Sequence, residues 1–383
     1  MAGPAIFRQW RDFPKAATVE FGRLGYGRGA DAADSLRRAV GEMVETASCC
    51  AWGDEEVFDA PLLEIEDRAW GPEEITGFAD WQRRDRADWN DRLAGLDWIP
   101  PEFRPEIPIG WMTAKRLDED SDIFLPADAV LIGRRENLDA CACAVADTNG
   151  CAAGATEEGA LLAALYELIE RDATARWWYG QRPCQQIDPA RIASGDAIVQ
   201  SLSDRGRVLW LLDITSDIAV PTVAAVACDL AGRYVGAGFA TLAGLEAAAH
   251  AALIELMQME LKIAAAIARP DLVPNLAQWF KEIDFGGSAP FGDVDPQDRQ
   301  SLARDIAPGL SACLELLAQS GCRAAVVELT RPQFGVPVFR AISPDLCHWK
   351  PRFGRARLIG CNHGDQDGGY STNLANLGPL LRV

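Results

Sequence analysis

The stretch that decides the fold is residues 147–178, DTNGCAAGATEEGALLAALYELIERDATARWW. Small residues predict a turn over residues 149–154, and an apolar helix follows that carries Glu167, Glu170 and Arg171. Charged side chains in an apolar helix are costly to bury unless they are paired or bind a metal. Glu167 and Glu170 lie at i, i+3 on one helix face, where a divalent cation would relieve their repulsion. Taken alone, the pair is more typical of a solvated helix face.

The same pattern occurs earlier in the chain. Residues 25–29, GYGRG, predict a turn that opens a helix over residues 30–50, with Asp31 or Asp34 as its N-cap. The apolar residues of this helix follow the helical period. Its first-turn glycine and its ExxE pair can be aligned with those of the central helix: Gly29 with Gly154, Glu42 with Glu167, and Glu45 with Glu170.

The two glycine-turn-helix units carry ExxE at the same distance from the glycine. This repetition favours a paired carboxylate site over two solvated helix faces. If the two helices pack side by side, their carboxylates converge and can hold more than one Mg²⁺.

A third unit follows at lower similarity. Gly236-Ala-Gly238 predicts another turn before a long helix over residues 242–268, which carries Glu255 and Gln258 at i, i+3.

Composition narrows the function classes. The chain has 383 residues, 49% of them hydrophobic, and a formal net charge of −19. The size allows one large domain or two coupled ones, and we expect a single domain over residues 1–383. The negative charge disfavours nucleic acid and anionic membranes as partners.

The sequence contains neither a signal-peptide pattern at its start nor an apolar run of membrane-spanning length. The 11 cysteines lack zinc-ligand spacing, and we interpret them as small apolar filler. These observations predict a cytoplasmic protein with reduced thiols.

Residues 51–128 are rich in Trp and acidic side chains. We interpret this segment either as an insertion that covers the core or as a platform for a peptide or protein partner, since Trp and Arg are enriched at binding hot spots. Within it, residues 73–96 predict one amphipathic helix, and residues 105–117 and 123–132 predict extended pieces. The last segment, residues 359–383, is expected to be a flexible tail.

In the second half of the chain, apolar β-branched runs predict strands, and residues 301–321 predict a helix after a loop over residues 282–300. The runs are residues 207–215, 219–230, 323–329 and 335–342. Helices and strands alternate irregularly, and some helix and strand patterns occur twice in the chain. This predicts an α+β fold with pseudo-repeated units of mixed β-sheet packed against helices. The P-loop motif is absent, and no GxGxxG follows a clean strand.

With these motifs in hand, the chain resembles the YcaO family of ATP-dependent enzymes that activate peptide backbone amides, from about Gly25 to Leu358. The central signature, TNGCAAG followed by ExxERDA at residues 148–173, is the most specific match. Weaker matches fall in the right order: GRG with Glu42-x-x-Glu45, Glu255-x-x-Gln258, and LTRP before GVPV at residues 329–338.

The resemblance implies a YcaO-like fold and a Mg²⁺–ATP site. The implied metal ligands are Glu42, Glu45, Glu167 and Glu170. Arg171 is implied as a phosphate contact and, with Glu167 and Glu170, as part of the catalytic set. Arg28 and Gln258 are implied to lie near the nucleotide. The implied substrate is a precursor peptide or protein, whose backbone amide is activated by O-phosphorylation.

The sequence departs from the family pattern at several positions. Arg28 stands for a lysine, Thr46 for an arginine, and Ala155 and Gly159 for an Asn and a Glu that contact nucleotide. The chain ends GPLLRV, without the Pro-rich tail of azoline-forming members. We therefore expect thioamide formation with a TfuA-like partner first. The alternatives are azoline formation, a ThiF-like partner, or a degenerate non-catalytic relative that binds a peptide or partner enzyme; a homodimer is a further expectation.

Overall fold

The protein is described by a computed structural model, which divides the chain into two compact units. One unit comprises Met1–Leu168 and Gly309–Asp345, and the other comprises Ile169–Pro308 and Leu346–Val383. The expected single domain stays a prediction. Arg28, most of the predicted loop at 282–300 and most of the tail at 359–383 lie outside the described residues. The structure describes residues 25, 27, 31–94, 96–134, 142–182, 184–271, 277–280, 283, 304–359 and 381.

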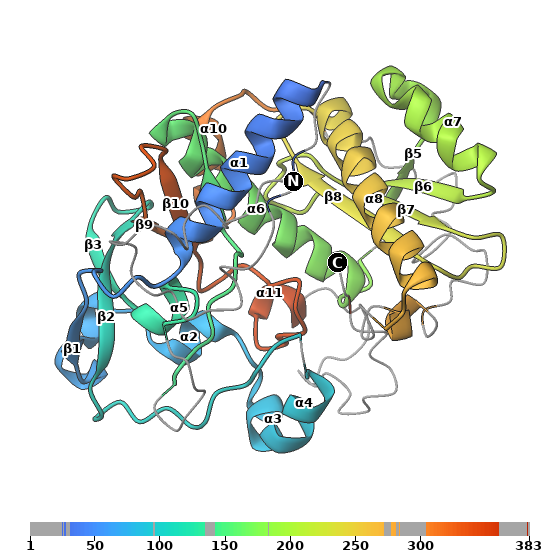
Figure 1. Ribbon diagram of the computed structural model, residues 1–383. Coiled ribbons are helices and arrows are strands. Elements are labelled where there is room, and N and C mark those ends of the chain that lie inside the picture. The colour runs from blue at the N-terminus through green and yellow to red at the C-terminus, as the bar shows by residue number, and fades with distance from the viewer. Residues whose placement is uncertain are drawn as a thin grey trace. The chain divides into compact units, whose positions relative to one another are not determined.

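The first unit contains a six-stranded sheet of order β1-β2-β9-β10-β4, with β3 also paired to β2 (Figure 1). Its described strand pairs are all antiparallel, where the sequence predicted mixed sheets. The strands are β1 (Phe58–Ala60), β2 (Ile109–Arg116), β3 (Asp122–Pro126), β4 (Cys151–Ala153), β9 (Ala325–Glu328) and β10 (Val338–Ile342).

Helix α1 (Ala32–Cys49) packs against β4 and β10 of this sheet. It begins as predicted, because the Asp31 carboxylate accepts a hydrogen bond of 2.8 Å from the Asp34 amide. Helix α6 (Glu157–Trp178) is the predicted central helix, and its first part belongs to this unit. The remaining helices of the unit are α2 (Pro72–Thr76), α3 (Asp80–Arg84), α4 (Arg86–Arg92), α5 (Ala127–Val130) and α10 (Leu310–Gln319).

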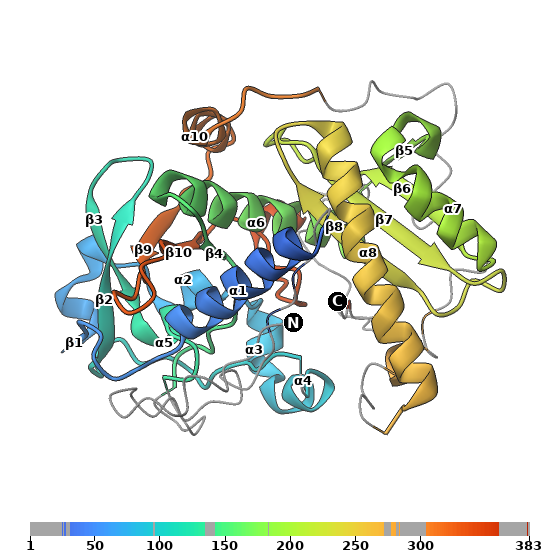
Figure 2. The same ribbon diagram turned by 45° about the horizontal axis from the view of Figure 1, so that its top comes forward.

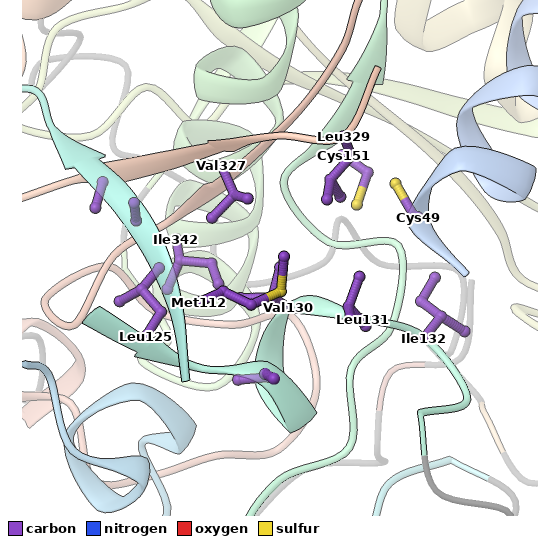
Figure 3. Close-up of a cluster of buried hydrophobic side chains, with 14 of the residues drawn as sticks. Cys49, Met112, Leu125, Val130, Leu131, Ile132, Cys151, Val327, Leu329 and Ile342 are labelled. Atoms are coloured by element: carbon purple, nitrogen blue, oxygen red, sulfur yellow. The ribbon is translucent and has the colours of Figure 1, made fainter. Parts of the chain in front are cut away.

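The core of the first unit gathers side chains from the sheet, from α5 and from the end of α1. Leu125, Val130 and Leu131 are almost fully buried within it. Figure 3 shows Met112, Val327 and Ile342 in the same cluster, with Cys49 and Cys151 at one side. The cysteines of the described residues are buried free thiols, as the filler interpretation predicts.

The second unit contains a four-stranded antiparallel sheet of order β5-β6-β7-β8. Helix α8 (Leu245–Ala268) packs on β8 and β7, and α7 (Asp196–Asp204) packs on β6 (Figure 2). The strands are β5 (Gln185–Ile187), β6 (Val208–Asp213), β7 (Thr222–Cys228) and β8 (Gly236–Thr241). The last part of α6 and the short α11 (Ala356–Ile359) complete the unit.

The predicted third glycine turn is wrong, because Gly236 and Gly238 lie inside strand β8. A Cβ atom at Gly238 would lie 2.3 Å from the backbone oxygen of Ala252 and 2.3 Å from the amide nitrogen of Leu256. The strand needs glycine here so that α8 can approach its backbone closely. At the level of sequence, a glycine required for close approach has the same pattern as a glycine required for a turn.

Three further predictions of local structure need correction. The turn predicted over residues 149–154 ends at Gly150, and β4 follows at once because β10 pairs with it. The helix predicted over residues 73–96 is split into α2, α3 and α4: Gly77, in a left-handed conformation with φ 69°, ends α2, and Asp85 separates α3 from α4. The helix predicted from residue 301 begins at Leu310, after Pro308 and a Gly309 with φ 110°.

The Trp-rich segment 51–128 contributes β1, β2 and β3 to the sheet of the first unit. Trp52, Trp70, Trp89 and Trp111 are buried, so these four side chains support the packing interpretation over a partner platform. Among the described residues, no helix combines the length and apolar character that a membrane span requires.

The close approach at Gly238 predicts the effect of adding a methyl group. Gly238→Ala should lower the free energy of unfolding by about 1–3 kcal/mol, because the new Cβ meets the α8 backbone, which cannot rotate away. Urea denaturation followed by circular dichroism measures this change. Gly41→Ala is the matched control: it lies in α1 with open space around it, so it should raise stability by about 0.5–1 kcal/mol. Equal effects of the two substitutions would contradict the packing argument.

Candidate functional site

Helix α1, which carries Glu42 and Glu45, lies in close contact with the backbone at two glycines. A Cβ at Gly27 would lie 1.6 Å from the Ser35 oxygen, and one at Gly25 would lie 2.2 Å from the Ala39 oxygen. The predicted GYGRG turn therefore includes backbone that lies directly against the helix. This arrangement repeats what Gly238 does for α8 in the second unit.

Glu45 is held by one backbone donor and faces several groups that oppose its negative charge. The Ala153 amide of β4 donates a hydrogen bond of 3.3 Å to Oε2 of Glu45. Burial raises the pKa of the Glu45 carboxyl well above its usual value, and the charges of Glu167 and Glu42 raise it further. The Ala153 hydrogen bond lowers this pKa, but it is the smaller effect. Glu42 and Glu167 thus both act on the charge of Glu45 within the first unit.

Two thiols and one buried guanidinium lie beside this carboxyl group. Figure 3 shows the sulfur atoms of Cys49 and Cys151 turned toward each other, and a hydrogen bond between these thiols raises the pKa of Cys49. Nη1 of Arg340 lies 3.5 Å from the Cys151 sulfur. Burial lowers the pKa of Arg340, but the negative groups around it, among them Cys151, Asp147 and Glu167, raise it overall. Arg340 is therefore a fixed cation among acidic groups.

The other predicted site residues of α6 and α8 belong to the second unit. Glu170 follows Glu167 by three positions in α6, and its carboxylate lies 3.3 Å from Nη1 of Arg171. On α8, Glu255 accepts a hydrogen bond of 3.2 Å from the Phe239 amide of β8. Gln258 lies on the same helix, partly buried. Glu255 and Glu45 therefore have matching roles, since each glutamate on a helix accepts from the amide of an adjacent strand.

The carboxylate set of the first unit fits a magnesium ion that is bound together with phosphate. In the described part of the chain, no group of three or more His, Cys, Asp or Glu side chains is placed so that it could hold a metal ion. Mg²⁺ commonly takes one or two protein carboxylates and completes its shell with water and substrate phosphate. Glu42 and Glu167 each act on the charge of Glu45, and a cation bound with phosphate beside Glu45 would offset that repulsion.

Sequence reasoning missed two charged groups that organise the signature motif. Asp172, in the ERDA part, is fully buried and accepts hydrogen bonds of 3.0 and 2.7 Å from Arg357, and one of 2.9 Å from the Cys347 amide. The signal was present, because a buried aspartate in an apolar helix requires partners. The second group is Arg340, and nothing in the sequence around it distinguishes it from other strand residues.

Comparison with known proteins gives this arrangement a family. Residues 26–347 match the family model described as "YcaO cyclodehydratase, ATP-ad Mg2+-binding". The chain belongs to the YcaO family. The predicted α+β, YcaO-like fold is thereby confirmed, as is the resemblance read from the motifs.

Similar proteins agree with this family. A curated relative from Rhizobium leguminosarum bv. trifolii, described as "Uncharacterized protein in tfuA 3'region", is 31% identical over 210 residues, which is 52% of this chain and 44% of that protein. A solved "Heterocyclase in complex with substrate and Cofactor" is 26% identical with a TM-score of 0.80, over 87% of this chain and 46% of that one.

The YcaO protein from Methanopyrus kandleri, solved with AMPPCP and Mg²⁺, has a TM-score of 0.53 at 22% identity, over 82% of this chain and 76% of that one. This likeness concerns the fold alone. The chain spans less than two thirds of the length of the curated relatives it matches.

The raised pKa of Glu45 predicts how stability depends on pH in metal-free buffer. The carboxyl group is protonated more readily in the folded than in the unfolded chain, so its contribution is lost as pH rises above the usual value of 4.5. Glu45→Gln imitates the protonated form. Its melting temperature should therefore equal that of the unaltered protein near pH 4 and exceed it increasingly at higher pH. Each pH unit of pKa difference corresponds to about 1.4 kcal/mol.

Differential scanning calorimetry from pH 4 upward, with EDTA present, measures this trend. Glu328→Gln is the control, because Glu328 is an exposed carboxylate on β9 and its replacement should shift the melting temperature little. A Glu45→Gln difference that stays constant with pH would show that the carboxyl group is not destabilised by its surroundings.

Proposed function

We propose that this chain uses ATP to O-phosphorylate a backbone amide of a peptide or protein, with thioamide formation as the product. The observation that carries the proposal is the buried Glu45 carboxyl, whose pKa is raised by burial and by the charges of Glu167 and Glu42, in a family whose model is described as ATP- and Mg²⁺-binding. Carboxylates that are costly to keep together become favourable ligands once a divalent cation is bound.

Each chain residue has a specific role in this reaction. Glu42, Glu45, Glu167 and Glu170 would hold Mg²⁺, which neutralises charge on the triphosphate when bound. Arg171 would contact a transferring phosphoryl oxygen, and its neighbour Glu170 keeps its guanidinium oriented. Gln258 and Arg28 would contribute to nucleotide binding. The Ala153 amide fixes one carboxylate oxygen of Glu45, so that the other oxygen can serve as a ligand.

The chemistry balances with sulfide as the nucleophile. Hydrosulfide adds to the amide carbon, and the carbonyl π electrons move to oxygen. This oxygen attacks the γ-phosphorus of ATP, and ADP leaves. Loss of phosphate and of the thiol proton then forms the C=S bond. Phosphorylation is needed because an amide oxygen is a poor leaving group, and positioning with charge neutralisation supplies the catalysis.

Two observations bear on the product. The relative described by its position in the tfuA 3' region supports a TfuA-like partner and therefore thioamide formation. The structural likeness to a heterocyclase in complex with substrate and cofactor favours the alternative, azoline formation with a Cys, Ser or Thr side chain as nucleophile. A third candidate is a non-catalytic relative that binds the peptide or a partner enzyme, motivated by the Trp-rich segment 51–128; the departures at Ala155 and Gly159 bear on ATP turnover. A ThiF-like partner, a homodimer and a cytoplasmic location stay predictions.

Nucleotide binding provides the first test. The chain should bind the non-hydrolysable analogue AMPPCP in the presence of Mg²⁺, and Glu42→Gln or Glu167→Gln should weaken this binding at least tenfold, which is about 1.4 kcal/mol. Isothermal titration calorimetry at fixed Mg²⁺ measures the affinity. Glu328→Gln should bind like the unaltered protein. Unchanged affinity in the Glu42 and Glu167 variants would remove these carboxylates from the site.

Turnover and product identity provide the second test. With a TfuA-like protein, a candidate peptide, sulfide and ATP, we expect release of ADP and phosphate. The mass of the peptide should rise by about 16 Da, because sulfur replaces oxygen in a thioamide. A loss of about 18 Da indicates azoline formation instead. Binding of nucleotide or peptide without phosphate release would support the non-catalytic alternative.

A further inference from the structure

Two buried arginines hold the two backbone segments that meet at Glu45. Arg331 follows β9, and Arg340 lies in β10. Both belong to the first unit, and neither is among the residues that the family resemblance assigns to the nucleotide. Their side chains are 10% and 5% exposed, so each guanidinium is withdrawn from water and needs partners.

Arg331 fixes the C-terminal end of α1. Its Nη2 donates to the backbone oxygen of Cys50 at 3.4 Å, and it also pairs with Glu55. Its Nη1 lies 2.6 Å from Asp54, and its guanidinium stacks over Trp52 at 4.4 Å from the ring centroid. Nε1 of Trp52 in turn donates a hydrogen bond of 2.8 Å to the backbone oxygen of Ala47 in α1. The end of the helix that carries Glu45 is thereby held from two directions.

Arg340 fixes the segment that provides the hydrogen-bond donor to Glu45. Its Nη1 donates to the Asp147 oxygen at 2.6 Å, where the signature turn begins. The turn then lies directly on β10, because a Cβ at Gly150 would meet the Ala341 oxygen at 2.2 Å. Arg340 is paired in register with Cys151 of β4, two residues before Ala153. The position of the Ala153 amide therefore depends on this strand pair and on its arginine.

Stability alone does not account for Arg340. Its buried Nε has no hydrogen-bond partner among the described residues. A guanidinium buried with an unsatisfied donor is commonly no more stabilising than an apolar side chain of similar size. An arginine at this point is better explained by the geometry that it imposes on the turn and on β4.

We propose that Arg331 and Arg340 are positioning residues that set the Glu45 carboxylate for Mg²⁺–nucleotide binding, Arg331 through the end of α1 and Arg340 through β4. The part of the inference that concerns nucleotide binding rests on the proposed function. The part that concerns the hydrogen bond between Ala153 and Glu45 does not depend on the nucleotide.

The test combines two readouts on the full chain. Arg331→Met and Arg340→Met should each weaken binding of AMPPCP with Mg²⁺ at least tenfold, measured by calorimetry. In the nucleotide-free protein, hydrogen exchange at the Ala153 amide should be faster in both variants. Arg331→Lys and Arg340→Lys keep the charge and guard against misfolding of the methionine variants. They should lose affinity by a smaller factor, because one ammonium group cannot reproduce the fork of a guanidinium.

Arg323→Met is the matched control. Arg323 precedes β9 and forms an ion pair with Asp345 at 2.8 Å and with Glu74 at 3.1 Å. These partners lie on neither α1 nor β4. Arg323→Met should therefore lower the melting temperature while nucleotide affinity and Ala153 exchange remain unchanged.

A double-mutant cycle separates positioning from general stability. In a Glu45→Gln background, Arg340→Met should cause little further loss of nucleotide affinity, because its effect acts through Glu45. Fully additive losses, or unaltered affinity and Ala153 exchange in the Arg340 variants, would overturn the proposal. If the unaltered chain binds no nucleotide, the proposed function fails, and unchanged Ala153 exchange would then be needed to reject the positioning role as well.

Discussion

The first unit is organised around one unfavourable carboxyl group. Glu45 lies among Glu42, Glu167 and two thiols, and burial and the neighbouring charges together raise its pKa. The described structure offers it one hydrogen bond, from the Ala153 amide. A group in this position costs stability unless a cation or a proton accompanies it. The surrounding elements are explained by the need to keep this carboxyl group in place.

The close contact of helices with glycine-bearing backbone is a second constraint, and it occurs in both units. Gly25 and Gly27 lie against α1, and Gly238 lies against α8. On each of these helices a glutamate also accepts from a strand amide: Glu45 from Ala153 in the first unit, and Glu255 from Phe239 in the second. Helices α1 and α8 therefore share a close glycine contact and a glutamate that accepts from a strand amide.

Arginine side chains bind groups in or next to the signature motif in both units. Asp172 of the ERDA motif binds Arg357, which also binds Asp217 at 2.9 and 3.0 Å. Burial by itself raises the pKa of Asp217, yet the hydrogen bonds from Arg357 and Arg176 hold it well below its usual range. In the first unit, Arg331 and Arg340 fix the segments on either side of Glu45. Asp172, Arg331 and Arg340 each bind at least one backbone group.

The sequence by itself determined the helices α1, α6 and α8, the strands β6, β7, β9 and β10, and the glutamate pairs on the helices. These depend on local signals: the helical period of apolar residues, the Asp31 cap and β-branched runs. The family followed from the central signature. The spacing of one glutamate pair alone is typical of a solvated helix face, and the pair was singled out because the same pattern occurs twice in the chain.

Only the tertiary structure decided which residues surround those carboxylates. A glycine required by a neighbouring helix, such as Gly238, looks like a turn glycine, because the helix that requires it is remote in the sequence. Arg340 and Cys151 meet because β10 pairs with β4 across 189 positions of the chain. Pairing at that separation depends on the whole sheet, and no local pattern encodes it. The sequence therefore determined which carboxylates are paired on apolar helices, and the fold decided which amide donates to Glu45 and which arginines hold the adjoining backbone.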